Sequence, residues 1–188
     1  MAEVILICGR ICSGKSWYAR QLQKKIPSVI LSTDEVTWDL TDNAQGEGYV
    51  ALAQRVNRYL RKKAVEIVKA GASVILDWGF WSEEDRKEIT SFFRSNGVPF
   101  VWHYLDTDDA LWQENIRQRN ARVQRGEGGS DFYVDDGLLR KMRALFEEPT
   151  RDAMDVWVEV TGQHEQRITR KGERMDFPQE QDCEGKTI

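Results

Sequence analysis

Residues 9–16 read Gly-Arg-Ile-Cys-Ser-Gly-Lys-Ser, and they directly follow the apolar run Val-Ile-Leu-Ile-Cys of residues 4–8. The pattern G-x-x-x-x-G-K-S after a buried strand is typical of a phosphate-binding P-loop that leads into a helix. Glycine at positions 9 and 14 lets the backbone turn tightly and direct several N–H groups at one phosphate chain, and a Cβ at either position would interfere. An ordinary strand-to-helix turn is the alternative, but the motif and its context favour nucleotide binding.

The end of the motif supplies the chemistry that a nucleotide needs. Lys15 can reach the β- and γ-phosphates as a point charge, and Ser16 can give its hydroxyl to Mg²⁺, while the helix N-terminus adds positive partial charge. No guanine-reading motif is present, so we expect ATP and Mg²⁺ as cofactors. The expected nucleotide-binding residues are Gly9, Ile11, Cys12, Ser13, Gly14, Lys15, Ser16 and Trp17.

The composition predicts one intracellular domain. The chain has 188 residues and a net charge of −4, so as a whole it is not an electrostatic partner for nucleic acid or an anionic membrane. Its three cysteines (Cys8, Cys12 and Cys183) lack metal-ligand spacing, and no apolar run approaches the length of a membrane span. We expect a cytoplasmic protein with free thiols, with no membrane partner and with nucleic acid less favoured than a small molecule.

The order of apolar runs predicts the fold class. Strands are expected over residues 4–8, 28–32, 74–77, 98–105 and 156–160, with helical patterns between them. Alternating strands and helices imply an α/β fold of three layers, in which helices cover both faces of a five-stranded parallel sheet. The polar, glycine-containing residues 39–48 are expected to form a loop near the site, and residues 162–188 a polar surface extension of the domain formed by residues 1–161.

Two aspartates follow strands at the edge where ligands of such sheets bind. Asp34 comes just after the second strand, where it is either chemically active or only a helix N-cap. Asp77 ends the third strand, in the manner of a Walker-B aspartate, so it can lie beside Mg²⁺, contact an acceptor or serve structure alone.

Four arginines lie close together in the second half of the chain. Arg117, Arg119, Arg122 and Arg125 precede the glycine-rich residues 126–130, and this segment of about 114–134 looks like a basic, mobile flap. A solvated helix face with ion pairs is the alternative, but Glu114 and Glu127 are the only acidic residues near the run, which leaves most of the arginines without helical partners.

With these motifs in order, the chain resembles the P-loop kinases that phosphorylate a hydroxyl group, which include polynucleotide 5′-kinases, zeta-type toxins and chloramphenicol phosphotransferase. The resemblance spans about residues 3–160. The matching stretches are GRICSGKS at 9–16, LSTDE at 31–35, VILD at 74–77, YLDT at 104–107 and IRQRNAR at 116–122.

This resemblance assigns roles to the charged residues. It implies that Asp34 is the general base that accepts the acceptor's proton, which agrees with the need of phosphoryl transfer for one carboxylate that orients the nucleophile. It implies that lid arginines close over the phosphates, with Arg119 the first choice and Arg122 and Arg117 behind it. Lys15 completes the expected catalytic set.

The acceptor is expected to be a small molecule with a hydroxyl group. Trp38, Trp78, Phe80 and Trp81 follow the second and third strands, and together with Asp34 and Asp77 they can form an aromatic acceptor pocket, although large aromatics often only pack in the core. Phage-type polynucleotide kinases carry an arginine where this chain has Thr37. A polynucleotide-kinase-like or zeta-toxin-like enzyme, or a nucleotide-binding regulator without an acceptor, are the alternatives. The sequence does not indicate an oligomeric state.

Overall fold

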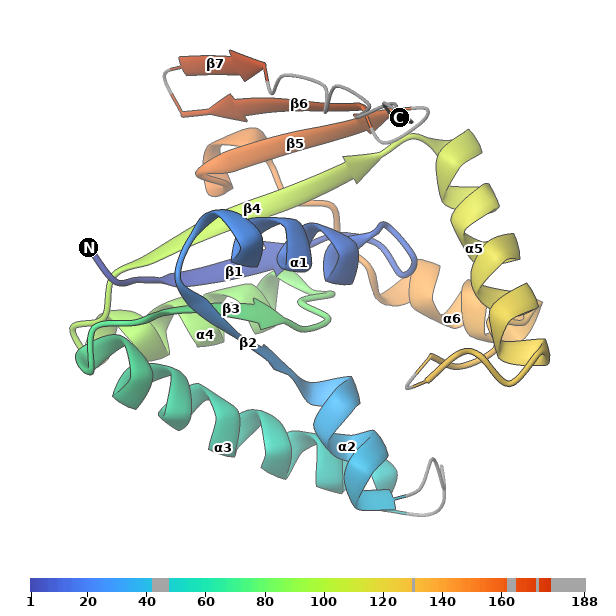
Figure 1. Ribbon diagram of the computed structural model, residues 1–188, viewed down its shortest axis with the longest axis horizontal. Helices are drawn as coiled ribbons and strands as arrows, with labels where there is room; N and C mark the ends of the chain where they lie inside the picture. Colours follow the sequence, from blue (N-terminus) through green and yellow to red (C-terminus); the bar gives the residue numbers. More distant parts are fainter. Residues whose placement is uncertain (42–47, 130, 162–164, 172, 177–188) are drawn as a thin grey trace, which may run out of the picture.

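The computed structural model describes residues 1–41, 48–129, 131–161, 165–171 and 173–176, and it forms a seven-stranded sheet (Figure 1). The strands are β1 (Val4–Cys8), β2 (Ser28–Ser32), β3 (Ser73–Asp77), β4 (Phe100–Thr107), β5 (Val156–Thr161), β6 (Glu165–Arg170) and β7 (Glu173–Asp176). Their order in the sheet is β2-β3-β1-β4-β5-β6-β7, and the first five are parallel. The predicted α/β fold with a five-stranded parallel sheet is therefore confirmed.

Helices cover both faces of this sheet, as the layered fold predicts. They are α1 (Lys15–Lys25), α2 (Thr33–Thr41), α3 (Tyr49–Lys69), α4 (Glu83–Ser95), α5 (Asp109–Gln124), α6 (Asp136–Leu145) and the 3₁₀ turn Arg151–Ala153. Figure 1 shows α1 in front of the sheet and α4 behind it. Within the described ranges, no helix combines the length and the apolarity needed to cross a membrane.

The central strand β1 shows why its sequence is apolar without a break. Val4, Leu6 and Cys8 pack into the core cluster that includes α3 and α4, whereas Ile5 and Ile7 pack into the cluster that includes α1. Side chains of a strand alternate between the two faces, so a strand covered on both faces needs apolar residues at every position. All five residues of β1 are buried.

The parallel register brings the carboxyl ends of β1, β2, β3 and β4 to one edge of the sheet. Ser32 of β2 is opposite Asp77 of β3, and Cys8 of β1 is opposite Tyr104 of β4. The segments that follow these strands are the P-loop, the start of α2, residues 78–82 and the start of α5. The sequence motifs therefore converge at this edge.

Three local expectations need correction. The loop expected at residues 39–48 begins later, because α2 continues to Thr41, and residues 42–47 lie outside the described ranges. The apolar run of residues 28–32 favours a buried strand, but β2 is only half-buried, with Val29 40% exposed, because it lies at the edge of the sheet. The expected polar extension includes two further strands, β6 and β7.

The strand β6 pairs with β5 in antiparallel fashion, and Ile168 opposite Val158 is buried. An antiparallel strand such as β6, which pairs with β5 on one side and β7 on the other, can leave one face in water, so it needs few apolar residues. This explains why its polar sequence gave no strand signal. Cys183 and residues 177–188 lie outside the described ranges.

The N-terminus of α4 is held by hydrogen bonds between two residues close in sequence. Ser82 accepts a hydrogen bond from the Asp85 amide, and the Asp85 side chain accepts one from the Ser82 amide, which forms the capping box that the local sequence Ser82-x-x-Asp85 favours. We expect Ser82→Ala to lower the free energy of unfolding by about 1 kcal/mol in urea titrations. Ser91→Ala, in the exposed middle of the same helix, is the control and should cause no loss. Equal stability of both variants would contradict the capping role.

Candidate active site

Two glycines shape the P-loop for different reasons. A Cβ at Gly9 would lie 2.7 Å from Ser13 Oγ and 3.1 Å from the Leu105 carbonyl oxygen, so a side chain does not fit there. The Cβ of a residue at position 14 would meet nothing within 4 Å, but Gly14 has a φ of +91°, which is in the left-handed region that glycine favours. The expected interference is therefore steric at Gly9 and conformational at Gly14.

The other P-loop residues differ in how much they face solvent. The side chains of Ile11 and Ser13 are buried, Cys12 is half-buried with a φ of +58°, and Ser16 and Trp17 are exposed at the start of α1. The Ser13 hydroxyl has no hydrogen-bond partner within the described part of the chain. A buried hydroxyl without a partner can be satisfied by an oxygen of a bound ligand.

Lys15 places its ammonium group at the mouth of the loop. Its Nζ donates to the carbonyl oxygens of Gly9 (3.0 Å) and Arg10 (2.8 Å), and it lies 5.0 Å from the centre of the Trp81 ring. Burial lowers the pKa of Lys15, and the negative charge of Asp77 opposes this shift most strongly. A buried ammonium of this kind is stabilised by an anion, which a phosphate group would supply.

The outer side of the P-loop is hydrogen-bonded to β4 and α5. The carbonyl oxygens of three successive residues, Ile11, Cys12 and Ser13, accept from side chains. The donors are Trp112 Nε1 (2.6 Å), Asn115 Nδ2 (3.1 Å) and Thr107 Oγ1 (2.8 Å), in that order. The sequence does not reveal these donors, because they lie about a hundred residues from the motif and no spacing rule connects the two segments.

Asp34 lies in the first turn of α2, and it does not cap this helix. The cap is Ser32, whose hydroxyl accepts from the Glu35 amide at 3.3 Å. Among the described residues, no hydrogen bond reaches the Asp34 carboxylate, and the residue is exposed to solvent. The alternative in which Asp34 is only an N-cap is therefore wrong.

The pKa of Asp34 shows which charges surround it. Partial removal from water raises its pKa, as does the negative charge of Asp77, while Arg119 and Lys15 oppose the shift. Asp34, Asp77, Lys15 and Arg119 thus lie close enough to influence one charge, although they come from four separate segments of the chain. The net effect favours the protonated form of Asp34 compared with an ordinary aspartate.

Arg119 is the lid arginine that reaches the P-loop. Its Nη1 contacts Cys12 Sγ at 3.5 Å, its Nε donates to the Phe132 carbonyl oxygen at 3.1 Å, and its side chain is only 15% exposed. Next to it, the Asn120 amide donates to the Val134 carbonyl oxygen (2.8 Å) and accepts from the Val134 amide (2.7 Å). These two residues fix the returning segment of the lid against α5.

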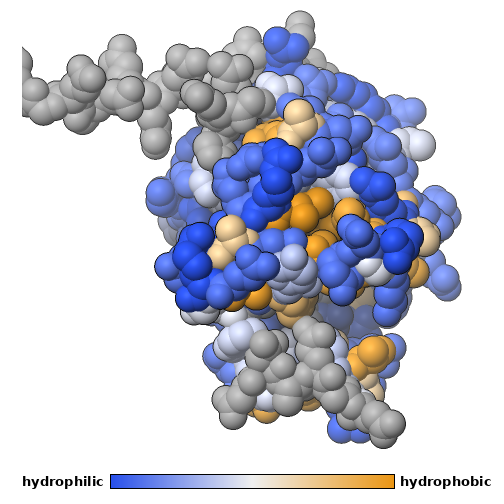
Figure 2. Space-filling model, turned by 90° about the vertical axis from the view of Figure 1, so that its right-hand side faces the viewer, coloured by the Kyte–Doolittle hydropathy of each residue, from blue (hydrophilic) through white to orange (hydrophobic). Residues whose placement is uncertain are grey.

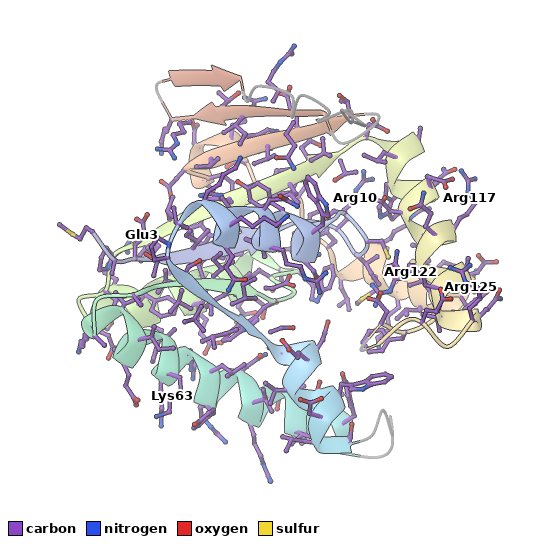
Figure 3. All side chains as sticks on the ribbon, viewed as in Figure 1. Glu3, Arg10, Lys63, Arg117, Arg122 and Arg125 are labelled. Carbon is purple, nitrogen blue, oxygen red and sulfur yellow. The ribbon has the colours of Figure 1, made fainter. Side chains whose placement is uncertain are left out.

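The other lid arginines are paired with carboxylates, but most of these partners lie outside α5, which agrees with the expectation that most of the arginines lack helical partners. Arg122 bonds to Asp131 at 3.1 Å, and Asp131 also binds Arg119 at 3.2 Å. Arg117 pairs with Glu114 and Arg125 with Glu127. Asp131 lies in the segment that follows α5 and folds back toward it, so the spacing of residues along the helix does not predict this ion pair. Figure 3 shows Arg117 on the outer side of α5 and Arg122 and Arg125 near its far end.

The aromatic residues expected in the acceptor pocket divide into two groups. Trp78 and Phe80 are buried in the core, where Trp78 Nε1 donates to the Leu31 carbonyl oxygen at 3.0 Å. Trp78 therefore belongs to the core, and not to the acceptor pocket in which it is expected from the sequence. Trp81 and Trp38 are half-buried at the edge of the site, and Trp38 follows Asp34 by four residues on α2, so the two share one helix face.

An apolar cluster supports the lid side of this region. Ile11, Trp112 and Val134 are buried, and half-buried apolar side chains pack around them, namely Cys12, Trp81, Ile116, Leu138, Leu139 and Met142. Figure 2 looks onto this end of the sheet and shows apolar surface in its middle, surrounded by hydrophilic side chains. The site thus combines an apolar wall with a charged loop.

The residues present fit a nucleotide phosphate chain with Mg²⁺. The glycine-lined loop, the Lys15 ammonium and the unpartnered Ser13 hydroxyl match the needs of phosphate oxygens. In the described part of the chain, no group of three or more His, Cys, Asp or Glu side chains could hold a metal. Mg²⁺ in such sites takes one or two protein ligands and completes its shell with phosphates and water, so Ser16 and Asp77 are sufficient candidates.

Comparison with known proteins identifies the family and the fold. Residues 4–149 match the family described as an AAA domain, so the chain belongs to this family of P-loop proteins. A search of curated proteins gives no significant match. The fold is that of P-loop kinases, as the sequence resemblance predicts.

Several solved structures share this fold. A sugar kinase from a Janibacter species has a TM-score of 0.56 at 14% identity, with 85% of this chain and 86% of that chain covered. The APS kinase CysC of Mycobacterium tuberculosis, in complex with AMPPNP and APS, has a TM-score of 0.56 at 18% identity, with 84% and 88% covered. A chain from the PezAT toxin-antitoxin system of Streptococcus pneumoniae has a TM-score of 0.56 at 17% identity, with 88% and 70% covered.

The raised pKa of Asp34 predicts a gain of stability when its charge is removed. In the unfolded chain Asp34 ionises at an ordinary pKa, whereas folding makes ionisation less favourable, so the folded state loses stability as pH rises through the raised pKa. We expect Asp34→Asn to raise Tm at pH 7, and this gain to shrink as pH falls toward the ordinary aspartate pKa. Asp39→Asn, on the exposed far end of α2, is the control. A lower Tm for Asp34→Asn at pH 7 would contradict the electrostatic picture.

Proposed function

We propose that the protein is an ATP-dependent phosphotransferase that moves the γ-phosphoryl group to a hydroxyl of a small-molecule acceptor. The observation that carries this proposal is the position of Asp34. Its carboxylate has no structural hydrogen bond in the described residues, it lies within the influence of the Lys15 and Arg119 charges, and its helix begins at the carboxyl end of β2. A nucleotide-binding regulator without an acceptor has no need of a carboxylate held there.

The proposed reaction assigns one task to each charged residue. Asp34 accepts the proton of the acceptor hydroxyl as that oxygen bonds to the γ-phosphorus, and the bond from phosphorus to the β,γ-bridging oxygen breaks to release ADP. Lys15 balances charge on the phosphates, and Arg119, with Arg122 beside it, stabilises charge that spreads in the transition state. Ser16 and Asp77 would hold Mg²⁺, which neutralises phosphate charge when bound.

The acceptor side of the site favours a small molecule over an oligonucleotide end. Thr37, at the position of the acceptor-binding arginine in phage-type polynucleotide kinases, is fully buried, and its hydroxyl donates to the Thr33 carbonyl oxygen at 2.9 Å. The half-buried Trp38 and Trp81 offer aromatic surface beside the two aspartates instead. A polynucleotide-kinase-like or toxin-like activity remains the second candidate, because a chain of the PezAT system shares the fold.

The proposed organisation follows from the same residues. We place the kinase domain at residues 1–161, with its lid at about 114–134, and a C-terminal extension at residues 162–188, whose described parts include β6 and β7 of the sheet. We expect the protein to act in the cytoplasm, without a membrane partner, where ATP and Mg²⁺ are available.

Transfer of label from γ-labelled ATP tests the function directly. The acceptors would be nucleosides, sugars, hydroxylated antibiotics and oligonucleotides, each with wild type and Asp34→Asn. We expect label in one class of small molecule, and a loss of about a thousandfold in the variant, because asparagine cannot accept the proton. Calorimetry should show unchanged ATP binding. Label only on oligonucleotide ends would favour the second candidate, and transfer at the wild-type rate by Asp34→Asn would exclude the assigned base.

The lid arginines provide a matched pair of variants. We expect Arg119→Met to lower kcat about a thousandfold, because its guanidinium reaches the P-loop. Arg117→Met removes the same charge from the same helix, but Arg117 is paired with Glu114 on the outer side, so kcat should stay within about twofold of wild type. Initial rates at saturating ATP measure both. Equal losses in the two variants would refute a specific role for Arg119.

A further inference from the structure

The P-loop is held from outside by a stripe of side chains on one helix face. Trp112, Asn115 and Arg119 are spaced by three and four residues on α5, and all three contact Ile11 or Cys12. Thr107, at the end of β4, adds the contact to the Ser13 carbonyl oxygen. Consecutive carbonyl groups of the loop are thus bound by residues that the sequence motif does not contain.

Binding a carbonyl group also orients the next amide. A trans peptide unit is planar, so the C=O of one residue and the N–H of the following residue point in opposite directions. The bonds from Trp112 to Ile11 and from Thr107 to Ser13 therefore direct the amides of Cys12 and Gly14 away from β4 and α5. Neither amide has a hydrogen-bond partner in the described residues, whereas the Ser13 amide is already bonded to the Arg10 carbonyl oxygen at 3.2 Å.

We infer that Trp112 is a positioning residue that, with Thr107 and Asn115, arranges the P-loop amides for phosphate before a nucleotide binds. This inference rests on the proposed nucleotide-binding function. Trp112 is held from several sides, because the residue is 2% exposed and the guanidinium groups of Arg10 and Arg143 lie 4.4 Å and 4.8 Å from its ring centre. A loop that is already arranged binds its ligand without the cost of ordering its backbone.

The same helix links loop shape to the lid. Arg119 follows Trp112 by two helical turns, and its guanidinium contacts Cys12 Sγ, in the residue whose amide Trp112 orients. The helix α5 therefore carries both the donor that orients a phosphate-binding amide and the lid arginine. Loss of the Trp112 bond should weaken nucleotide binding more than it weakens the chemical step.

Two tryptophan variants separate this role from ordinary stability. Trp112→Phe removes the bond to the loop and keeps an aromatic ring. Trp102→Phe removes another indole hydrogen bond of a buried tryptophan, from Trp102 Nε1 to Thr90 Oγ1 at 3.0 Å, in the core behind the sheet. Calorimetric titration with AMPPNP and Mg²⁺ gives the dissociation constant, steady-state assays give KM for ATP and kcat, and thermal unfolding gives Tm.

We expect Trp112→Phe to raise the dissociation constant and KM about tenfold with little change in kcat, and Trp102→Phe to lower Tm without changing either constant. Thr107→Val, which removes the neighbouring donor at nearly constant volume, should act in the same direction, and it replaces Trp112→Phe if that variant does not fold. Unchanged AMPPNP binding by a folded Trp112→Phe or Thr107→Val would overturn the inference. Absence of AMPPNP binding by wild type would instead remove the proposed function on which the inference rests.

Discussion

The hydrogen bonds to the P-loop carbonyl groups are the constraint on which this site depends. Lys15 binds the carbonyl oxygens of Gly9 and Arg10 from the mouth of the loop, and β4 and α5 bind those of the next three residues from outside. A loop that includes left-handed backbone at Cys12 and Gly14 would otherwise have many conformations in water. Bonded from both sides, it keeps one conformation that leaves amide donors available to an anion.

Positive and negative side chains lie close together around the loop, and a bound nucleotide would add negative charge to them. The charge of Lys15 interacts with those of Asp34 and Asp77, the charge of Arg119 interacts with that of Asp34, and Asp131 forms ion pairs with Arg119 and Arg122 on the lid side. A phosphate chain adds negative charge close to Lys15, which burial otherwise disfavours in its charged form. Keeping Asp34 ionised and without a hydrogen bond lowers the stability of the folded state. A residue with this effect is better explained by a role in chemistry than by a role in stability.

The sequence predicts the parallel sheet, the P-loop and the capping box of α4 because these depend on local patterns: apolar runs, fixed glycines and Ser82-x-x-Asp85. It does not reveal the strand β6 or the Asp131 bridge, whose signals lie in pairing between distant segments. The sequence also does not decide whether Trp78 lies in the core or in the site, since the side chain of a tryptophan after a strand can turn toward either. Trp112 is hidden for the same reason, because its partner lies 101 residues away.

The fold alone does not define a substrate, since the neighbours named above include a sugar kinase and an APS kinase at 14% and 18% identity. The claim specific to this chain is that Asp34 and Lys15 face one phosphoryl group from two sides. A crystal structure with AMPPNP and Mg²⁺ would test it most directly. We expect the γ-phosphoryl group between Lys15 and the Asp34 carboxylate, with Arg119 turned toward it. A nucleotide bound elsewhere, or a γ-phosphoryl group that Asp34 cannot reach through an acceptor oxygen, would contradict the account.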